Sequence, residues 1–396
     1  MAGPRVLYLC GWPIGSHGEG AASFVYEQIA ELAAHVRAAY VEHRFAGALD
    51  WARRRASGRD VEPITDLWPE RVTARRVWTP RWSPRLTRRG LLDDVWHAGA
   101  MVAARVTRAW GGVDLVHAHV VLPAGLLGAA VAQALGVPLV LQEHSGPFEM
   151  HLDSEEKRAA VRRAVGRARL VLAVSDGLAR RIDDGAAAAG RIHVVPNLVR
   201  TDIFAARPRT DAGGVLRVIS VGGLHPVKGL DTLLRAIAEL RARNCAVHVE
   251  IVGDGDMRAA LESLVRELGL SAQVSLTGAL PRAAVAERLA AAQLYVCSSR
   301  HETFGLAPAE ALAVGRPVVS TRCGGPEAFV DERCGALVAP DDPRAMADAI
   351  VRTWRRVGDF DPVRLHDEID ARFGPRVFRE RMLGLYDHVL RDRAAA

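Results

Sequence analysis

The stretch VLRVISVGGLHPVKGLDTLLRAIAELRARNCAVHVEIVGDG, from Val215 to Gly255, decides the fold. It begins with a short β-branched run, turns through two glycines, and reaches a second such run after a helical stretch. Four further runs, VSLTG, LYVCSS, PVVSTR and GALVAP, continue the same order toward the C-terminus. Apolar strands separated by helices are typical of a parallel sheet covered on both faces. The second half therefore predicts one doubly wound domain.

The first half follows the same order less regularly. Strands are expected at Val6–Cys10, Val36–Val41, Leu115–Ala118, Leu139–Gln142, Leu170–Val174 and His193–Val195, with helices such as Ala21–Ala33, Ala124–Leu135 and Ser154–Ala168 between them. The segment LVRTDIFAARPRTDAGG (Leu198–Gly214) is rich in Arg, Pro, Asp and Gly, which indicates a linker.

We predict the α/β class, with two Rossmann-like doubly wound domains, 1–204 and 205–375, that face a central cleft. Ligands of such sheets bind at the carboxyl ends of the strands. The last helical segment, 376–391, lies beyond the regular pattern and can pack back on either domain; we assign it to the first.

Composition restricts the class of protein. The 396 residues are 49% hydrophobic and 25% charged, as in soluble globular proteins. The apolar run near the start is too short for a signal peptide, and the uncharged stretch Val120–Leu141 is broken by proline and glycine, so it predicts buried core. The five cysteines lack CxxC or zinc spacing, which favours reduced thiols. We expect a cytoplasmic protein, either free or peripheral to the inner face of the membrane.

The net charge of +6 is unevenly distributed. Between Asp50 and Trp110, arginines (53, 54, 55, 71, 75, 76, 81, 85, 88 and 89) are interleaved with tryptophans (51, 68, 78, 82 and 96). Such a region can be a solvated surface, or it can meet an anionic membrane or a phosphorylated acceptor. No helix-turn-helix, zinc-finger or RNA-binding motif accompanies it, so we expect no nucleic-acid partner.

The chemistry is concentrated in SSRHETFGLAPAEALAVGRPVVSTRCGGPE, Ser298 to Glu327. A strand ends at the serines, Glu302 follows in a loop, and a helix begins near Gly305. The amides at a helix start favour a phosphate or pyrophosphate. Glu310, more than a turn inside the helix, can then reach sugar hydroxyls, and Glu302 other hydroxyls of the ligand. The alternative, with Glu302 as a helix cap and Glu310 as a solvated residue, stays open.

This stretch resembles the Glu, seven residues, Glu signature of retaining nucleotide-sugar glycosyltransferases of family 4, which have the GT-B fold. The likeness covers nearly all of the second half, including VGGL…KG, VGDG, TGAL and CGALVAP. It implies retaining transfer of a sugar from a nucleoside-diphosphate donor (UDP or GDP) to a hydroxyl of a glycolipid, glycan or small-metabolite acceptor. The first domain would bind the acceptor and the second the donor. No metal or other cofactor is expected.

The resemblance also assigns roles to residues. Lys228, in the KG pair, would contact the donor diphosphate, and His144, in QEHSG, would lie near the donor sugar. With Glu302 these form the expected catalytic set. Gly18 and Gly20 of the N-terminal glycine-rich loop would let the backbone approach the ligands. The expected donor-binding set comprises Gly18, Gly20, Lys228, Phe304, Gly305, Leu306 and Glu310.

One position departs from the family pattern. Members often have Arg five residues before the lysine, where this chain has Gly223; Arg300 and His301 are candidate substitutes near in sequence. One other strand end, HAH, carries His117 and His119, which can be core histidines or site residues.

Competing functions remain to be separated. Asp254-Gly255-Asp256 spells a DxD metal pattern, but its place in a VGDG turn argues against a metal site. A nucleotide-sugar epimerase, a phosphorylase, or a non-catalytic sugar-nucleotide-binding protein could use a similar scaffold.

Overall fold

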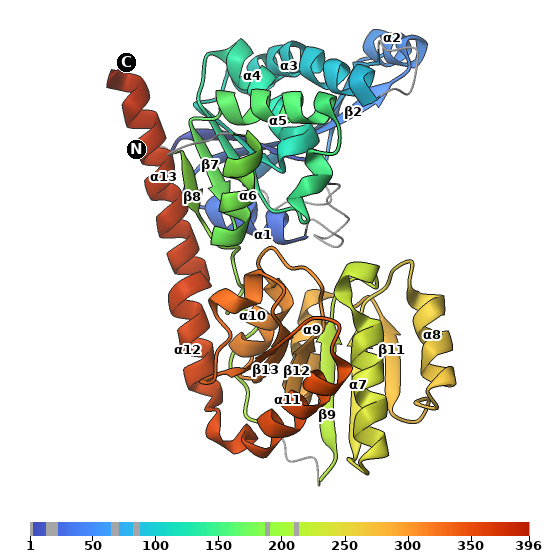
Figure 1. Cartoon of the computed structure of the whole chain (residues 1–396). Helices are drawn as coiled ribbons and strands as arrows, with labels where there is room; N and C mark the ends of the chain where they lie inside the picture. Colours follow the sequence, from blue (N-terminus) through green and yellow to red (C-terminus); the bar gives the residue numbers. More distant parts are fainter. Residues whose placement is uncertain are drawn as a thin grey trace. The chain divides into compact units, whose positions relative to one another are not determined.

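The computed structural model describes residues 3–12, 23–64, 71–81, 88–186, 191–209 and 214–395 (Figure 1). Gly18 and Gly20, together with Trp68, Trp82 and Arg85, lie outside these ranges. The chain forms two compact units: unit 1 comprises Met1–Leu198 and Phe378–Ala396, and unit 2 comprises Val199–Val377.

Unit 1 is built on an eight-stranded sheet in the order β3-β4-β2-β1-β5-β6-β7-β8. Its strands are β1 (Arg5–Cys10), β2 (Arg37–Ala46), β3 (Val61–Pro63), β4 (Val72–Pro80), β5 (Leu115–His119), β6 (Leu139–Glu143), β7 (Leu170–Ala173) and β8 (Ile192–Val194). All pair in parallel except β3, which is antiparallel to β4. The six predicted strands are present. The sequence analysis missed β3, which has three residues, and β4, because the charged VTARRVWTP of β4 lacks a continuous apolar run.

The helical elements of unit 1 cover both faces of this sheet. They are α1 (Ser23–Leu32), α2 (Ala48–Ala56), α3 (Arg88–Trp110), η2 (Val121–Gly125), α4 (Leu126–Leu135), η3 (Phe148–His151), α5 (Glu155–Arg167), α6 (Asp176–Ala186) and, from Phe378 onward, α13 (Pro375–Ala395). Figure 1 shows α3, α4 and α5 packed side by side.

Unit 2 contains a six-stranded parallel sheet in the order β11-β10-β9-β12-β13-β14. The strands are β9 (Leu216–Val221), β10 (Val247–Val252), β11 (Val274–Gly278), β12 (Leu294–Cys297), β13 (Val318–Thr321) and β14 (Gly335–Val338). The helical elements are η4 (Pro226–Lys228), α7 (Leu230–Ala242), α8 (Arg258–Glu267), α9 (Arg282–Ala291), α10 (Leu306–Ala313), η5 (Gly325–Ala328), α11 (Pro343–Arg355), η6 (Val357–Asp359) and α12 (Pro362–Phe373). The predicted fold class, two doubly wound parallel-sheet domains, is confirmed.

The uncharged stretch Val120–Leu141 is core, as predicted. Most of its large apolar side chains are buried; Leu122, Leu126, Val131 and Leu141, for example, are at most 8% exposed. Across the residues that the structure describes, we find no helix with both the length and the apolar character of a membrane span.

Helix α13 completes the core of unit 1. Phe378, Met382, Tyr386 and Val389 recur at helical spacing and lie in the same buried cluster as residues of β1, β2 and α1. The Tyr386 hydroxyl lies 2.7 Å from Nδ1 of His117. A helix that follows the whole of unit 2 in sequence thus supplies buried side chains to unit 1.

Three buried histidines meet at the carboxyl ends of β5 and β6. The ring centroids of His117 and His119 are 4.2 Å apart, and Nδ1 of His119 lies 3.0 Å from Nε2 of His144. Burial lowers the pKa of His117 and of His144 to about 3, and it lowers the pKa of His119 well below its usual value. All three imidazoles are therefore neutral at physiological pH.

These histidines should make unit 1 sensitive to acid. Unfolded imidazoles bind protons below about pH 6.5, whereas the folded ones stay neutral down to about pH 3. The stability they contribute is complete above about pH 6.5 and is lost as the pH falls toward 3. Between about pH 7 and pH 5 we expect a loss of about 1–2 kcal/mol for each buried histidine, measured as a lower urea midpoint.

His117→Leu should reduce this pH dependence, because one of the titrating groups is removed. The matched control His35→Gln, at an exposed position, should leave it unchanged. A urea midpoint of the wild type that is the same at both pH values would contradict the neutral state of the cluster.

Candidate functional site

Lys228 follows β9 in a loop that glycines allow to pack tightly. Gly229 has φ +56°, and a Cβ there would lie 2.2 Å from the carbonyl oxygen of Ser298 at the end of β12. The Ser298 hydroxyl donates to the Lys228 carbonyl at 2.9 Å. The lysine is thus held against the end of the neighbouring strand, 70 residues further along the chain.

The Lys228 ammonium contacts Glu302, the first acid of the predicted pair. Its Nζ lies 2.7 Å from Oε1 of Glu302, and the same oxygen accepts a bond from the Ser299 hydroxyl at 2.7 Å. Burial disfavours the charge of Lys228, but the carboxylate outweighs burial, so the pKa of the lysine lies above its usual value. Lys228 remains cationic at physiological pH.

The backbone of Glu302 is fixed by the loop after β13. Its amide donates to the Cys323 carbonyl at 2.8 Å, and its own carbonyl accepts from the Gly325 amide at 2.8 Å. Its side chain is 15% exposed and makes no capping bond to α10. The alternative in which Glu302 caps this helix is therefore wrong for this structure.

Glu310, the second acid, is buried in α10 with 3% exposure. Its Oε1 lies 2.6 Å from Nη1 of Arg282, at the start of α9, and the guanidinium of that arginine lies 4.8 Å from the ring centroid of Phe204. The solvated alternative for Glu310 is thus also wrong. Sequence reasoning missed Arg282, because no local signal links residues 28 apart on different helices.

Helix α10 begins where the sequence predicted a helix start, near Gly305. Gly305, with φ +87°, precedes Leu306, the first residue of α10. Phe304 is buried, with its ring centroid 5.5 Å from that of Phe329 and 5.2 Å from that of Phe373. This packing anchors the backbone whose amides begin α10, and those amides offer donors for an anion.

Gly223, where the family arginine is missing, faces a histidine. A Cβ at Gly223 would lie 2.8 Å from Cδ2 and 3.0 Å from Nε2 of His225, so the imidazole occupies the space beside the glycine. Nδ1 of His225 lies 2.7 Å from Oδ1 of Asp256. The guanidinium of Arg300, one of the two candidates from the sequence, instead bonds Asp231 at 2.9 Å and Asp341 at 2.8 Å.

The DxD pattern lies in an exposed turn after β10. The side chains of Asp254 and Asp256 are 57% and 70% exposed, and a Cβ on the intervening Gly255 would lie 2.6 Å from the Leu224 carbonyl oxygen. The turn thus packs against the loop that carries Lys228. Within the described ranges, no three His, Cys, Asp or Glu residues are grouped so as to hold a metal ion.

His144 in unit 1 uses both ring nitrogens inside the fold. Nδ1 lies 3.0 Å from Oδ1 of Asn197, which also accepts from Gln28 at 3.0 Å, and Nε2 lies 3.0 Å from His119. Since a carbonyl oxygen only accepts, Nδ1 carries the proton and Nε2 accepts from His119. The structure therefore brings together the three strand-end histidines that sequence analysis considered separately.

Glu143, next to His144, is a buried residue that the sequence analysis did not single out. One carboxylate oxygen accepts the Val121 amide at 2.6 Å, and the other accepts the amides of His144 and Ser145 at 2.8 and 2.6 Å. Glu143 thereby fixes η2 and the loop after β6. The pattern of an acid directly before the histidine was its only sequence signal.

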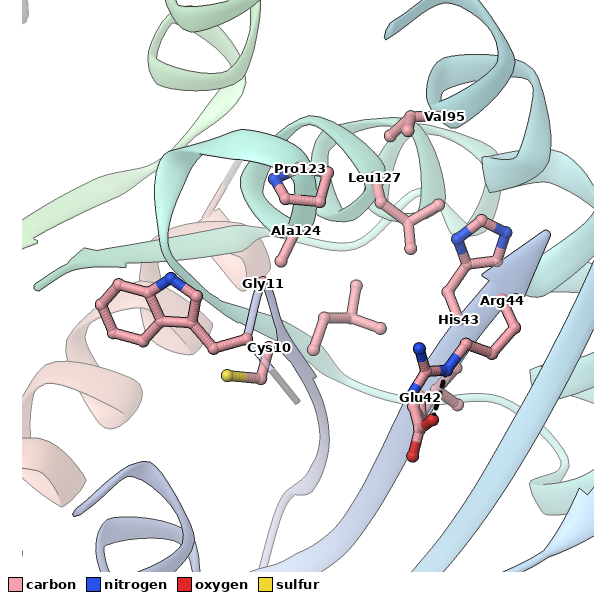
Figure 2. Close-up of a pocket in the computed structure, with 12 residues that line it drawn as sticks. Cys10, Gly11, Glu42, His43, Arg44, Val95, Pro123, Ala124 and Leu127 are labelled. Carbon is pink, nitrogen blue, oxygen red and sulfur yellow. Dashed lines mark hydrogen bonds and ion pairs between the residues drawn. The ribbon is translucent and has the colours of Figure 1, made fainter. Parts of the chain in front are cut away.

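A cavity of about 120 Å³ opens in unit 1 beyond the end of β1 (Figure 2). Val95, Pro123, Ala124 and Leu127 form an apolar wall, and the polar segment Glu42–Arg44 of β2 lies on another side; the remaining lining residues are Leu9, Cys10, Gly11, Trp12 and Val41. This cavity therefore combines one apolar surface with one polar surface.

The polar side of the cavity carries a buried carboxylate between two arginines. Oε1 of Glu42 lies 2.6 Å from Nε of Arg44 and 3.0 Å from Nε of Arg76. Burial alone would raise the pKa of Glu42, but the two guanidinium groups outweigh it and hold the pKa below its usual value. His43 beside it lies 2.7 Å from the Thr79 hydroxyl, and burial lowers its pKa to about 4.

Comparison with known proteins follows the same division of the chain. Residues 19–203 match the family described as Glycosyltransferase Family 4, and residues 216–356 match the family described as Glycosyl transferases group 1.

Among curated proteins, D-inositol 3-phosphate glycosyltransferase 1 of Catenulispora acidiphila is 32% identical over 75% of this chain and 75% of its own length. The 2-deoxystreptamine glucosyltransferase of Streptomyces kanamyceticus is 29% identical over 76% of this chain and 82% of its own.

Among solved structures, Anabaena HepE in complex with UDP superposes with a TM-score of 0.72, at 19% identity, over 97% of this chain and all of that one. The fold is therefore GT-B, as predicted from the sequence. From its sequence matches and its fold, this chain belongs to the family 4 glycosyltransferases.

Proposed function

We propose that this enzyme transfers a sugar, with retention of configuration, from a nucleoside-diphosphate donor bound by unit 2 to a hydroxyl of an acceptor bound by unit 1. The observation that carries the proposal is the arrangement at the strand ends of unit 2. There the cationic Lys228, the start of α10, and the two buried acids Glu302 and Glu310 occur together. They match the phosphates and the hydroxyls of a nucleotide sugar.

In this proposal the ammonium of Lys228 and the first amides of α10 bind the donor diphosphate. As the glycosidic bond breaks, negative charge grows on the leaving diphosphate, and fixed positive groups stabilise that charge most in the transition state. Glu302 and Glu310, each already held by a cation, accept hydrogen bonds from sugar hydroxyls. The diphosphate charge is carried by these groups without a metal ion.

The uncharged state of His144 suits a place near the donor sugar. An oxocarbenium-like transition state is positively charged, and a protonated imidazole beside it would oppose its formation. The pKa of His144, about 3, keeps the ring neutral. Because Asn197 and His119 engage its nitrogens, we assign these two residues to positioning the ring.

We further propose that the donor carries uridine and that the acceptor is a compact polyol. The HepE structure contains UDP, which favours UDP over GDP. The two curated relatives are named for inositol phosphate and 2-deoxystreptamine, both six-membered carbocycles with several polar groups. The cavity beyond β1 offers an apolar wall for such a ring and Glu42, His43 and Arg44 for its polar groups.

Location and partners complete the proposal. We infer a cytoplasmic enzyme that needs no nucleic-acid partner and that contacts the membrane only at its surface. The alternatives are an epimerase or a phosphorylase on the same scaffold, or a protein that only binds the nucleotide sugar. The products of the reaction, or their absence, distinguish these alternatives from a glycosyltransferase.

The donor and the reaction class can be tested together. UDP-glucose, GDP-glucose and ADP-glucose are compared by thermal shift, and we expect the UDP sugar to stabilise unit 2 by about 3 kcal/mol at a hundredfold its Kd. Proton NMR then follows the best donor with 2-deoxystreptamine or inositol 3-phosphate as acceptor. An α-linked product from an α-linked donor supports retention, whereas turnover without acceptor points to an epimerase, and binding without any product points to a binding protein.

Lys228→Ala and Glu302→Gln should each lower kcat by about a hundredfold or more, because each removes a group that acts on developing charge or holds its partner. Release of the nucleoside diphosphate measures the rate. The matched control is Lys157→Ala, which removes the other lysine of the chain, a residue bonded to Asp153 and the Met150 carbonyl. Rates within twofold of wild type for both site variants would end the assignment.

His225 is the residue that we propose in place of the missing arginine, since its imidazole lies beside Gly223. His225→Ala should raise the KM for the donor about tenfold, the worth of one hydrogen bond to a charged group. Adding Gly223→Arg to this variant should recover much of the loss, because the guanidinium then enters the vacated space. A single variant with unchanged donor KM would exclude His225 from phosphate binding.

A further inference from the structure

Helix α2 is a surface element whose nine residues include no buried side chain. It follows β2 directly and lies at the outer end of that strand (Figure 1). One face of the helix is fastened to unit 1 through Arg54. The guanidinium of Arg54 lies 4.1 Å from the ring centroid of Trp78, and its nitrogens bond Asp50 at 3.0 Å and Glu62 at 3.2 Å.

The opposite face of α2 is apolar. At 100° per residue, Ala48, Leu49, Ala52 and Ala56 fall within one quarter to one third of the helix circumference. All four are exposed, and Leu49, at 67%, is the most exposed large apolar side chain in the described part of the chain. Because Arg54 fixes the other side, this apolar stripe is directed toward solvent.

Positive charge surrounds the stripe. On the same helical projection, Arg53 and Arg55 flank it on either side. Residues 44–81 contain nine arginines and five acidic residues, an excess of four, whereas the formal net charge of the whole chain is +6. Among described residues, no ion pair with an acid occupies Arg53 or Arg59, so these charges are available to an anionic partner.

We propose that the apolar stripe of α2, with its flanking arginines, docks this enzyme on the surface of an anionic bilayer. An outward-facing apolar stripe between cationic side chains is the pattern of helices that lie in the membrane interface. Small ligands prefer concave, enclosed sites, whereas this helix is convex and without a single buried residue. A soluble polyanion would bind the arginines but would gain nothing from Leu49.

Docking of this kind brings the acceptor site to the membrane. The cavity beyond β1 is lined by Glu42, His43 and Arg44 of β2, and the same strand leads directly into α2. The statement that this cavity binds the acceptor rests on the proposed function. The docking of α2 on a bilayer does not depend on it.

The test is sedimentation of the full chain with vesicles of phosphatidylcholine alone or of an equal mixture with phosphatidylglycerol. We expect binding to the anionic vesicles only. Arg53→Glu with Arg59→Glu should weaken it at least tenfold, because each basic side chain near such a surface contributes a factor of about five. Wild-type sedimentation that is the same with both vesicles would overturn the proposal.

Two further variants distinguish a bilayer from other anions. Leu49→Ser keeps every arginine; it should lower vesicle binding but leave binding to heparin unchanged. If this variant bound vesicles as well as the wild type does, the proposal that the apolar stripe inserts into the bilayer would be overturned. Val363→Glu with Arg235→Glu places the same kind of change on exposed positions of unit 2 and should leave vesicle binding intact. Loss of binding in this control as well would show a nonspecific charge effect and would overturn the assignment to α2. Unchanged circular dichroism and an unchanged urea midpoint show that each variant is folded.

Discussion

The ion pair between Lys228 and Glu302 is the interaction on which the site of unit 2 depends. It joins residues 74 apart, and it forms only because β9 and β12 are adjacent parallel strands whose carboxyl ends meet at one edge. Each charge is partly withdrawn from water, so the loss of one partner would leave the other buried and uncompensated. In the proposed reaction, the donor diphosphate would change this balance: it would offer Lys228 a second, stronger anion and release the carboxylate of Glu302 for hydroxyl groups.

That edge can be so compact only because backbone approaches backbone. A Cβ on Gly253 would lie 1.9 Å from the Gly222 carbonyl oxygen, and the Leu224 amide donates to the Asp254 carbonyl at 2.9 Å. The glycines of VGG and VGDG therefore serve the contact between two turns. Asp254 of VGDG and the following Asp256 are exposed as a consequence, so the DxD pattern is accounted for by the turn itself.

The fold could be predicted from the sequence because parallel strands that are buried on both faces have continuous apolar sequences. Every strand predicted from an apolar run is present, whereas β4, which lies next to the edge strand and carries Arg75 and Arg76, has no such run and was not predicted. Lys228, Glu302 and the start of α10 could be predicted because their signal is local and dense. Arg282, His225 and Tyr386 could not, because each acts through a partner that only the folded chain supplies: Glu310, the space at Gly223, and His117.

Rarity alone would not have identified Lys228. The chain has two lysines. The other, Lys157, lies on α5 and bonds the Met150 carbonyl at 2.6 Å and Asp153, four residues before it in sequence, at 2.9 Å. Such a local contact contributes little to stability and does not depend on the rest of the fold. Lys228 differs because its partner comes from the loop after another strand, β12. Its charge is stabilised by that partner, and its own loop is bound to the end of β12. Position in the fold, rather than residue type, is what suits this lysine to the diphosphate contact that we propose.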